Sequence, residues 1–192
     1  TQFDLDTPTD VAILSVLRNS PGPFISLEDR ARSLMPLLCN RDTEILVAGR
    51  VGSATWKYLE GQTACRVRVV SEERGLATAP PEHVVRSILG FIAEDRGPEG
   101  LFEVVDALCD GAFIDSRIVL EHARVRASRE ERFQSDLLAP EAIETPWLQE
   151  LTRAALGRTS VLLGGHSLVS GGLMALNDAA WKGREAPEES SG

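Results

Sequence analysis

The chain is poor in lysine, in aromatic residues and in long apolar runs. Only Lys57 and Lys182 are lysines, so arginine supplies nearly all of the 20 basic residues. Aromatic residues make up 5% of the chain, which leaves a core built from Leu, Val, Ile and Ala. The apolar runs at 45–48 and 161–163 are far shorter than the ~20 residues that a membrane-spanning helix needs. We therefore expect no contact with a membrane and, because the N-terminus is acidic and polar rather than signal-like, a cytoplasmic protein.

Cysteines are also few and widely spaced. Cys39, Cys65 and Cys109 form no CxxC pair, which argues against a zinc site. In a cytoplasmic chain such thiols most often pack as small apolar side chains. The sequence thus predicts buried, reduced cysteines, no metal and no cofactor.

The net charge of −9 disfavours indiscriminate coating of DNA, although a local basic surface is compatible with it. Arginines gather in one segment, diluted by three glutamates. These arginines are Arg117, Arg124, Arg126, Arg129 and Arg132. If the segment is a strand, Arg124 and Arg126 share one face and could hold a phosphate together. The alternative is a solvated surface of ion pairs.

Helix and strand signals alternate along the chain. Thr-Pro pairs at 7–8 and 145–146 are typical of helix starts. Period-2 or continuous apolar patterns predict strands at 44–49, 65–70, 113–120, 122–127 and 160–163. This alternation predicts an α/β fold, a single layered domain whose central sheet is mixed, mostly parallel and flanked by helices.

The predicted domain spans residues 26–183. Residues 1–25 are expected to form an N-terminal helical appendage, and residues 184–192 a disordered tail. Residues 128–144 are charged and poorly periodic, which indicates a surface insertion.

The most informative stretch is 159–177, TSVLLGGHSLVSGGLMALN. It predicts a short apolar strand, a turn rich in glycine and serine, and the start of a helix. Such a turn exposes backbone N–H groups, which suit a phosphate or another anion.

Within that stretch, residues 164–173 (GGHSLVSGGL) resemble the second half of the phospholipase D superfamily signature. There a strand leads into Gly-Ser-x-Asn, then Leu-Thr, small residues, Gly-Leu and a nearby Asn. Gly164 matches the first glycine, whereas Gly165 and Ser167 stand at the serine and the asparagine. The resemblance implies a phospholipase D-like fold with a phosphate held at this turn. The ligand-binding residues expected on this basis are Gly164, Gly165, His166, Ser167, Ser170 and Asn177. The shared strand face described above adds Arg126 to them.

The catalytic half of that signature, His-x-Lys followed after four residues by Asp, is incomplete here. Only His122-Ala123-Arg124 approximates it, and Arg129 stands where the aspartate is expected. We therefore expect a non-catalytic module that binds phosphate or nucleic acid, or that regulates, in transcriptional control or in defence against foreign DNA. One alternative is a divergent phosphodiesterase or nuclease with His122 as nucleophile and Arg124 in place of the lysine. Another is a structural or scaffold subunit whose glycine turn is only structural.

Family members with one motif per chain often complete their site by dimerising. The resemblance therefore also implies a homodimer or a larger protein complex as the assembly.

Two further resemblances involve the same glycines. Residues 165–168 (GHSL) resemble the Gly-x-Ser-x-Gly turn of lipases, but Val169 replaces the second glycine and no histidine follows Ser167. Residues 164–165 and 172–174 resemble the Gly-Gly and Gly-Leu-Met pattern of the lysine-decarboxylase-like family, which implies a Rossmann-like nucleotide site.

Overall fold

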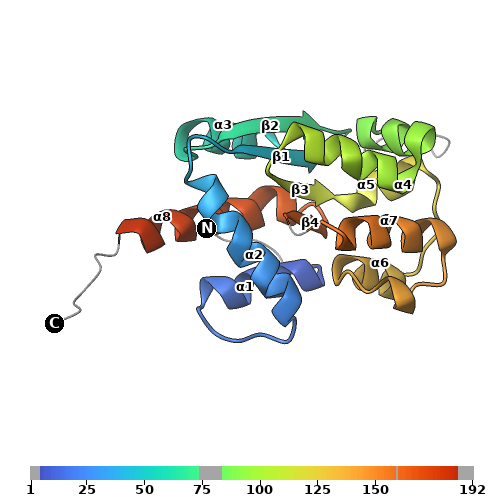
Figure 1. Cartoon of the computed structure of the whole chain (residues 1–192), viewed down its shortest axis with the longest axis horizontal. Coiled ribbons are helices and arrows are strands. Elements are labelled where there is room, and N and C mark those ends of the chain that lie inside the picture. The colour runs from blue at the N-terminus through green and yellow to red at the C-terminus, as the bar shows by residue number, and fades with distance from the viewer. Residues whose placement is uncertain (1–4, 74–83, 159, 186–192) are drawn as a thin grey trace.

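The computed structural model describes residues 5–73, 84–158 and 160–185. Its centre is a sheet of four strands in the order β2-β1-β3-β4, shown in Figure 1. The strands are β1 (Glu44–Gly49), β2 (Arg66–Ser71), β3 (Gly111–Asp115) and β4 (Val161–Gly164). All three strand pairs of this sheet are parallel. The prediction of an α/β domain is confirmed, whereas the prediction of a mixed sheet was wrong for the described residues. Each connection between sequential strands contains at least one helix, which brings the chain back so that the next strand runs in the same direction.

Helices cover both faces of the sheet, and on each face a cluster of buried apolar side chains lies between the sheet and its helices. The first face carries α1 (Pro8–Leu17), α2 (Ile25–Leu38), α3 (Ser53–Gln62) and α8 (Leu173–Glu185). The second face carries α4 (Ile88–Leu108), α5 (Ser116–His122) and α7 (Pro146–Leu156). In Figure 1, α1 and α2 lie side by side on one part of the molecule, and α4 and α7 on another.

Alternation along the strands explains why both faces are apolar. In β1, Ile45 and Val47 join the core under α1 and α2, whereas Leu46 and Ala48 join the core under α4 and α7. All four side chains are fully buried. A strand that is covered by helices on both faces has apolar side chains at nearly every position. β1 is therefore a continuous apolar run in the sequence, and this run predicted the strand.

The N-terminal helix belongs to the same core. Ala12 and Ile13 of α1 are fully buried, and the Thr9 hydroxyl donates a 2.6 Å hydrogen bond to the carbonyl of Leu163 in β4. The segment predicted as an appendage at 1–25 thus contributes a helix that packs on the sheet. At the other end, α8 continues to Glu185, and the predicted tail lies outside the described residues from 186 onward.

Of the two strands predicted at 113–120 and 122–127, the first was right only for 113–115, which belong to β3, and the second was wrong. β3 ends at Asp115, whose side chain accepts a hydrogen bond from the N–H of Arg117 and caps α5. The β-branched Ile118 and Val119 suggested a strand, but they are buried on one side of a short helix. His122 is therefore the last residue of helix α5 and does not lie on a strand.

The segment predicted as an insertion at 128–144 has its own structure. It contains α6 (Arg129–Asp136), which starts with a capping box, and the short 3₁₀-helix η1 (Pro140–Ala142).

The longest helix of the described residues, α4, is interrupted at Gly97, where φ is 74°. No helix in the described parts of the chain is both long enough and apolar enough to cross a membrane.

Candidate anion-binding site

The sheet order creates one position where neighbouring connections diverge. From β1 the chain moves to β2 on one side, whereas from β3 it moves to β4 on the other side. In open parallel sheets, ligands bind in the crevice beyond the carboxyl ends of the strands at such a switch point. Arg50 directly follows β1, and Asp115 is the last residue of β3. The candidate site is built around these two residues.

Gly49 lets the ends of β1 and β3 approach closely. Its φ is +137°, and a Cβ on it would overlap the Cβ of Asp115. The next residue, Arg50, turns back onto the same carboxylate. Its Nε donates to Asp115 Oδ2 at 2.7 Å and its Nη2 to Oδ1 at 3.1 Å. Asp115 is fully buried, and its hydrogen bond raises the pKa of Arg50.

Arg117 is held in the same way by a second buried carboxylate. Its Nη1 donates to Asp136 Oδ1 at 3.0 Å, and its Nη2 donates to Oδ2 of the same residue. Nη1 also donates to the Ser116 hydroxyl at 3.0 Å. Burial raises the pKa of Asp136 to about 7, because the lowering effect of Arg117 is smaller and the nearby Asp10 and Asp115 add to the rise. The two arginines are therefore fixed side chains, bound to buried acids from β3 and α6.

A cavity of about 610 Å³ opens beside these pairs. Five arginines and one carboxylate line it together with two aliphatic side chains, and no aromatic residue of the described chain is among them. The lining consists of Arg50, Arg117, Leu120, Glu121, Arg124, Val125, Arg126 and Arg132. Five guanidinium groups and one carboxylate give the lining an excess of positive charge, in a chain whose net charge is −9.

The arginines of the cavity differ in their partners. Arg132 donates to the carbonyl of Ala127 at 3.2 Å. Arg124 and Arg126 are exposed, and neither guanidinium has a hydrogen-bond or ion-pair partner among the described residues. The cluster predicted from the sequence is thus partly assembled here, although Arg124 and Arg126 come from the segment after α5 and not from a strand.

The turn rich in glycine and serine follows β4 as predicted, but its Ser167 is hydrogen-bonded to a buried acidic side chain. The Ser167 hydroxyl lies 2.7 Å from both carboxylate oxygens of Asp10. Asp10 is fully buried and also accepts the N–H and the hydroxyl of Thr7, each at 2.8 Å. Two amides of the turn, those of Ser170 and Gly172, donate to the carbonyl of Ser167. A buried carboxylate next to the turn repels an anion, so Gly164, Gly165 and Ser167 make a poor phosphate cradle.

His122 is packed against α4. Its side chain is 4% exposed, its Nδ1 accepts the N–H of Ser87 at 2.9 Å, and its Nε2 lies 3.3 Å from Glu94. A Cβ on Gly90 would overlap the imidazole, and the ring of Phe91 stands edge-on with centroids 4.5 Å apart. These contacts describe a histidine that joins α5 to α4.

The other residues predicted at the turn have internal roles. Asn177 of α8 is fully buried, and its Nδ2 donates to Tyr58 at 3.0 Å and to the Gln62 carbonyl at 2.9 Å, both in α3. The Ser170 hydroxyl donates to the carbonyl of His166 at 2.8 Å. Asn177 therefore connects two helices.

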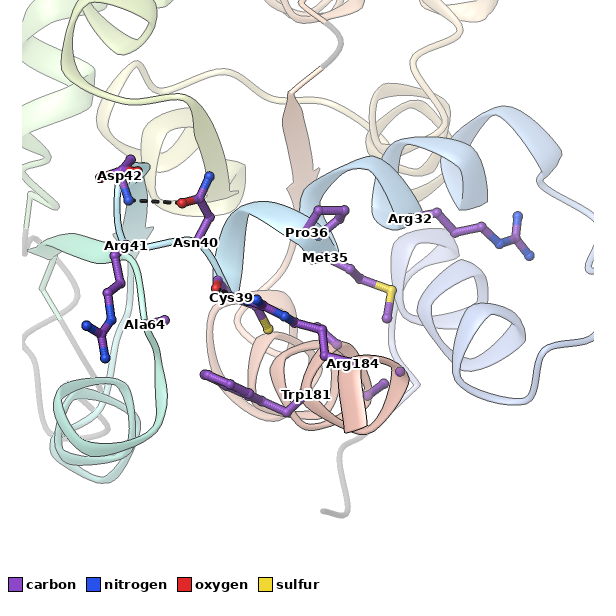
Figure 2. A pocket seen from close by; sticks show the side chains of 13 residues that line it. Arg32, Met35, Pro36, Cys39, Asn40, Arg41, Asp42, Ala64, Trp181 and Arg184 are labelled. Atoms are coloured by element: carbon purple, nitrogen blue, oxygen red, sulfur yellow. Dashed lines mark hydrogen bonds between the residues drawn. The ribbon is translucent and has the colours of Figure 1, made fainter. Parts of the chain in front are cut away.

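A second, larger cavity of about 1080 Å³ lies between α2, α8 and the residues just before β1. Figure 2 shows Arg32 and Arg41 at opposite ends of it, with Met35 and Trp181 between them. The guanidinium of Arg184 spans the space and donates to the carbonyl of Cys39. Three arginines and one aspartate line this cavity, but most of its lining is apolar. It also lies at the amino end of β1, whereas ligands of parallel sheets bind beyond the carboxyl ends of the strands.

Sequence reasoning missed Arg50, Asp115 and Asp136 as site residues. Arg50 had one signal, its position directly after a buried strand ending in glycine, where ligands of parallel sheets gather. Asp136 gave none, because its partner Arg117 lies on a different helix. No three or more His, Cys, Asp or Glu side chains of the described residues are grouped so as to hold a metal ion.

Comparisons with known proteins add no relative: no family model matches the chain, and neither a curated protein nor a solved structure matches it. The assignment of the site therefore rests on its geometry.

Proposed function

We propose that this chain is a binding module for phosphate-bearing ligands and that the arginine cavity holds the phosphate. The observation that carries the proposal is the convergence of five arginines at the carboxyl ends of β1 and β3. The proposal keeps the non-catalytic phosphate- or nucleic-acid-binding function predicted from the sequence. It moves the contacts from the glycine turn to the cavity, so Arg124 and Arg126 remain ligand residues.

Arginine suits this task because its planar guanidinium can bind two phosphate oxygens at once. Arg50 and Arg117 are already ordered by buried carboxylates, so a ligand that binds them loses little side-chain entropy. Arg124 and Arg126 are exposed and add positive charge that is not neutralised by a described neighbour. Arg50 and Arg117 thus form the ordered part of the proposed binding site, and the exposed Arg124 and Arg126 form a part that can adapt to the ligand.

Binding without catalysis is the function that these contacts support best. His122, the only nucleophile suggested by the phospholipase D-like resemblance, is tied to Ser87 and Glu94 and does not line the cavity. The resemblance itself stays a hypothesis about the origin of the fold. No contact of the described residues favours the phosphodiesterase alternative.

The test is calorimetric titration of tripolyphosphate at low ionic strength. We compare wild type with Arg124→Gln/Arg126→Gln and with a matched control, Arg32→Gln/Arg41→Gln, which removes two arginines from the larger cavity. We expect the first double variant to lose affinity at least tenfold, since a hydrogen bond to a charged group contributes about 1.5–3 kcal/mol. The control should stay within about threefold of wild type, the small loss that removing two remote charges causes. Absence of binding to wild type, or equal losses in both variants, would refute the proposal.

A further inference from the structure

The chain after α5 carries an unusual backbone conformation at Arg124. Its φ is +53°, in the left-handed region that favours glycine. The N–H of Arg124 donates to the carbonyl of Glu121, and the N–H of Val125 donates to the carbonyl of Leu120 at 3.0 Å. This pair of bonds is a Schellman motif with Arg124 at the position that glycine most often occupies.

An arginine at this position strains the backbone, and its side chain lines the arginine cavity. Backbone strain at a non-glycine residue is often found at functional sites. Asn19 and Leu138 also have a left-handed φ, and of these three described residues only Arg124 lines the cavity. Leu120 and Val125, which the Schellman motif brings together, line the same cavity. The motif therefore positions Arg124 and the cavity wall at once.

The cavity holds more arginines than are needed to contact each oxygen of one phosphate once. A phosphate has four oxygens, and two bidentate guanidinium groups contact each of them once. Arg50 and Arg117 are a first pair at the strand ends, and each guanidinium is already bound to a buried carboxylate through some of its N–H groups. Arg124 and Arg126 form a second pair without described partners. Two pairs in one cavity suit two phosphoryl groups.

The remaining lining indicates what accompanies those groups. No aromatic side chain of the described residues lines the cavity, so a base would find no stacking surface there. Its volume of about 610 Å³ lies in the range of small-molecule sites, ~300–1,000 Å³. Both features point to a compact ligand that is recognised by its phosphates.

We propose that the cavity takes a ligand with two or more directly linked phosphoryl groups, one held by Arg50 and Arg117 and the next by Arg124 and Arg126. Arg124, in its left-handed conformation, is the residue that distinguishes such a ligand from a monophosphate. This inference rests on the proposed phosphate-binding function. It covers inorganic polyphosphates and nucleoside diphosphates alike, because the linked phosphates are common to both.

The experiment compares Arg124→Gly with wild type in calorimetric titrations of orthophosphate, pyrophosphate, AMP and ADP. Wild type should bind pyrophosphate at least tenfold more tightly than orthophosphate, and ADP at least tenfold more tightly than AMP. Arg124→Gly should lose about tenfold in affinity for pyrophosphate while its affinity for orthophosphate stays within twofold. The melting temperature of the variant should rise by about 2–4 °C, because glycine relieves the strain.

Asn19→Gly is the matched control, because Asn19 is an exposed residue with a φ of 48°. It should leave all four affinities unchanged. If wild type binds none of the four ligands, the proposed function itself fails.

Three outcomes would overturn the inference and leave the proposed function standing. In the first, orthophosphate binds as tightly as pyrophosphate. In the second, Arg124→Gly weakens both ligands equally or neither. In the third, a single-stranded DNA oligonucleotide binds more tightly than pyrophosphate at equal phosphate concentration, which would assign the cavity to a nucleic-acid backbone.

Discussion

At the scale of single residues, Gly49 and Asp115 depend on each other. Gly49 supplies a backbone conformation with φ +137° and leaves the space that the Asp115 side chain fills. Asp115 in turn holds Arg50 with two hydrogen bonds. The absence of a Cβ at Gly49 thus allows the ion pair between Arg50 and Asp115 to form.

Gly49→Ala should lower the free energy of unfolding by about 3 kcal/mol, because overlap with Asp115 adds to backbone strain. Urea denaturation measures this. Gly61→Ala is the control, since a Cβ there meets no described atom within 4 Å and lies in α3. That control should be neutral or stabilise the fold by up to about 1 kcal/mol. Equal stabilities of the two variants would contradict the close approach of β1 and β3.

At the scale of elements, α1 is fastened to the turn after β4. Asp10 completes the capping box of α1 with Thr7 and binds the Ser167 hydroxyl. Thr9 reaches the carbonyl of Leu163 in the strand itself. The glycine turn therefore joins the N-terminal helix to the sheet.

Ser167→Ala should lower the free energy of unfolding by about 1–2 kcal/mol, because a hydrogen bond to a buried carboxylate is lost. Its affinity for tripolyphosphate should remain within twofold of wild type. Urea denaturation and calorimetric titration measure the two effects. Unchanged stability together with lost affinity would return the ligand to the glycine turn.

How much of these elements the sequence could predict depends on how local their causes are. The strands at 44–49, 65–70 and 160–163 agree with β1, β2 and β4 within one residue. Continuous apolar runs identify the buried strands β1 and β4, whereas the edge strand β2 is recognised by its alternation of arginine and valine. Helix α5 was missed, because its β-branched residues outweighed the capping signal of Asp115. The predicted burial is confirmed for Cys39 and Cys65, whereas Cys109 is half-buried.

The site was predictable only in part for the same reason. The arginine cluster at 117–132 was visible as composition, and three of its members besides Arg117 line the cavity. Pairing of Arg50 with Asp115 and of Arg117 with Asp136 joins elements through the fold, which no local pattern encodes. Asp10, which accepts a hydrogen bond from Ser167 of the glycine turn, lies 157 residues from it in the sequence.

At the scale of the whole molecule, three buried acids come from three different elements, and their proximity affects the pKa of one of them, Asp136. Asp10, Asp115 and Asp136 are fully buried, and the first two help raise the pKa of the third to about 7. Between the usual aspartate pKa near 4 and this value, the folded state binds a proton that the unfolded state has released. The contribution of Asp136 to the free energy of unfolding therefore falls as the pH rises through this range.

The prediction concerns wild type and Asp136→Asn between pH 4 and pH 8. The free energy of unfolding of wild type, measured relative to that of the variant, should decrease from about pH 4 to about pH 7 and then stay constant. Urea denaturation at several pH values measures the difference. A difference that does not change with pH would contradict a raised pKa at Asp136.

The most direct measurement of the central claim is NMR of the arginine Nε–H groups during a titration with tripolyphosphate. The signals of Arg50, Arg117, Arg124 and Arg126 should shift with one common affinity. Those of Arg32, Arg41 and Arg184, which line the larger cavity, should stay in place. Shifts confined to the larger cavity, or to the backbone amides of Gly165 and His166, would contradict phosphate binding by the arginine cavity.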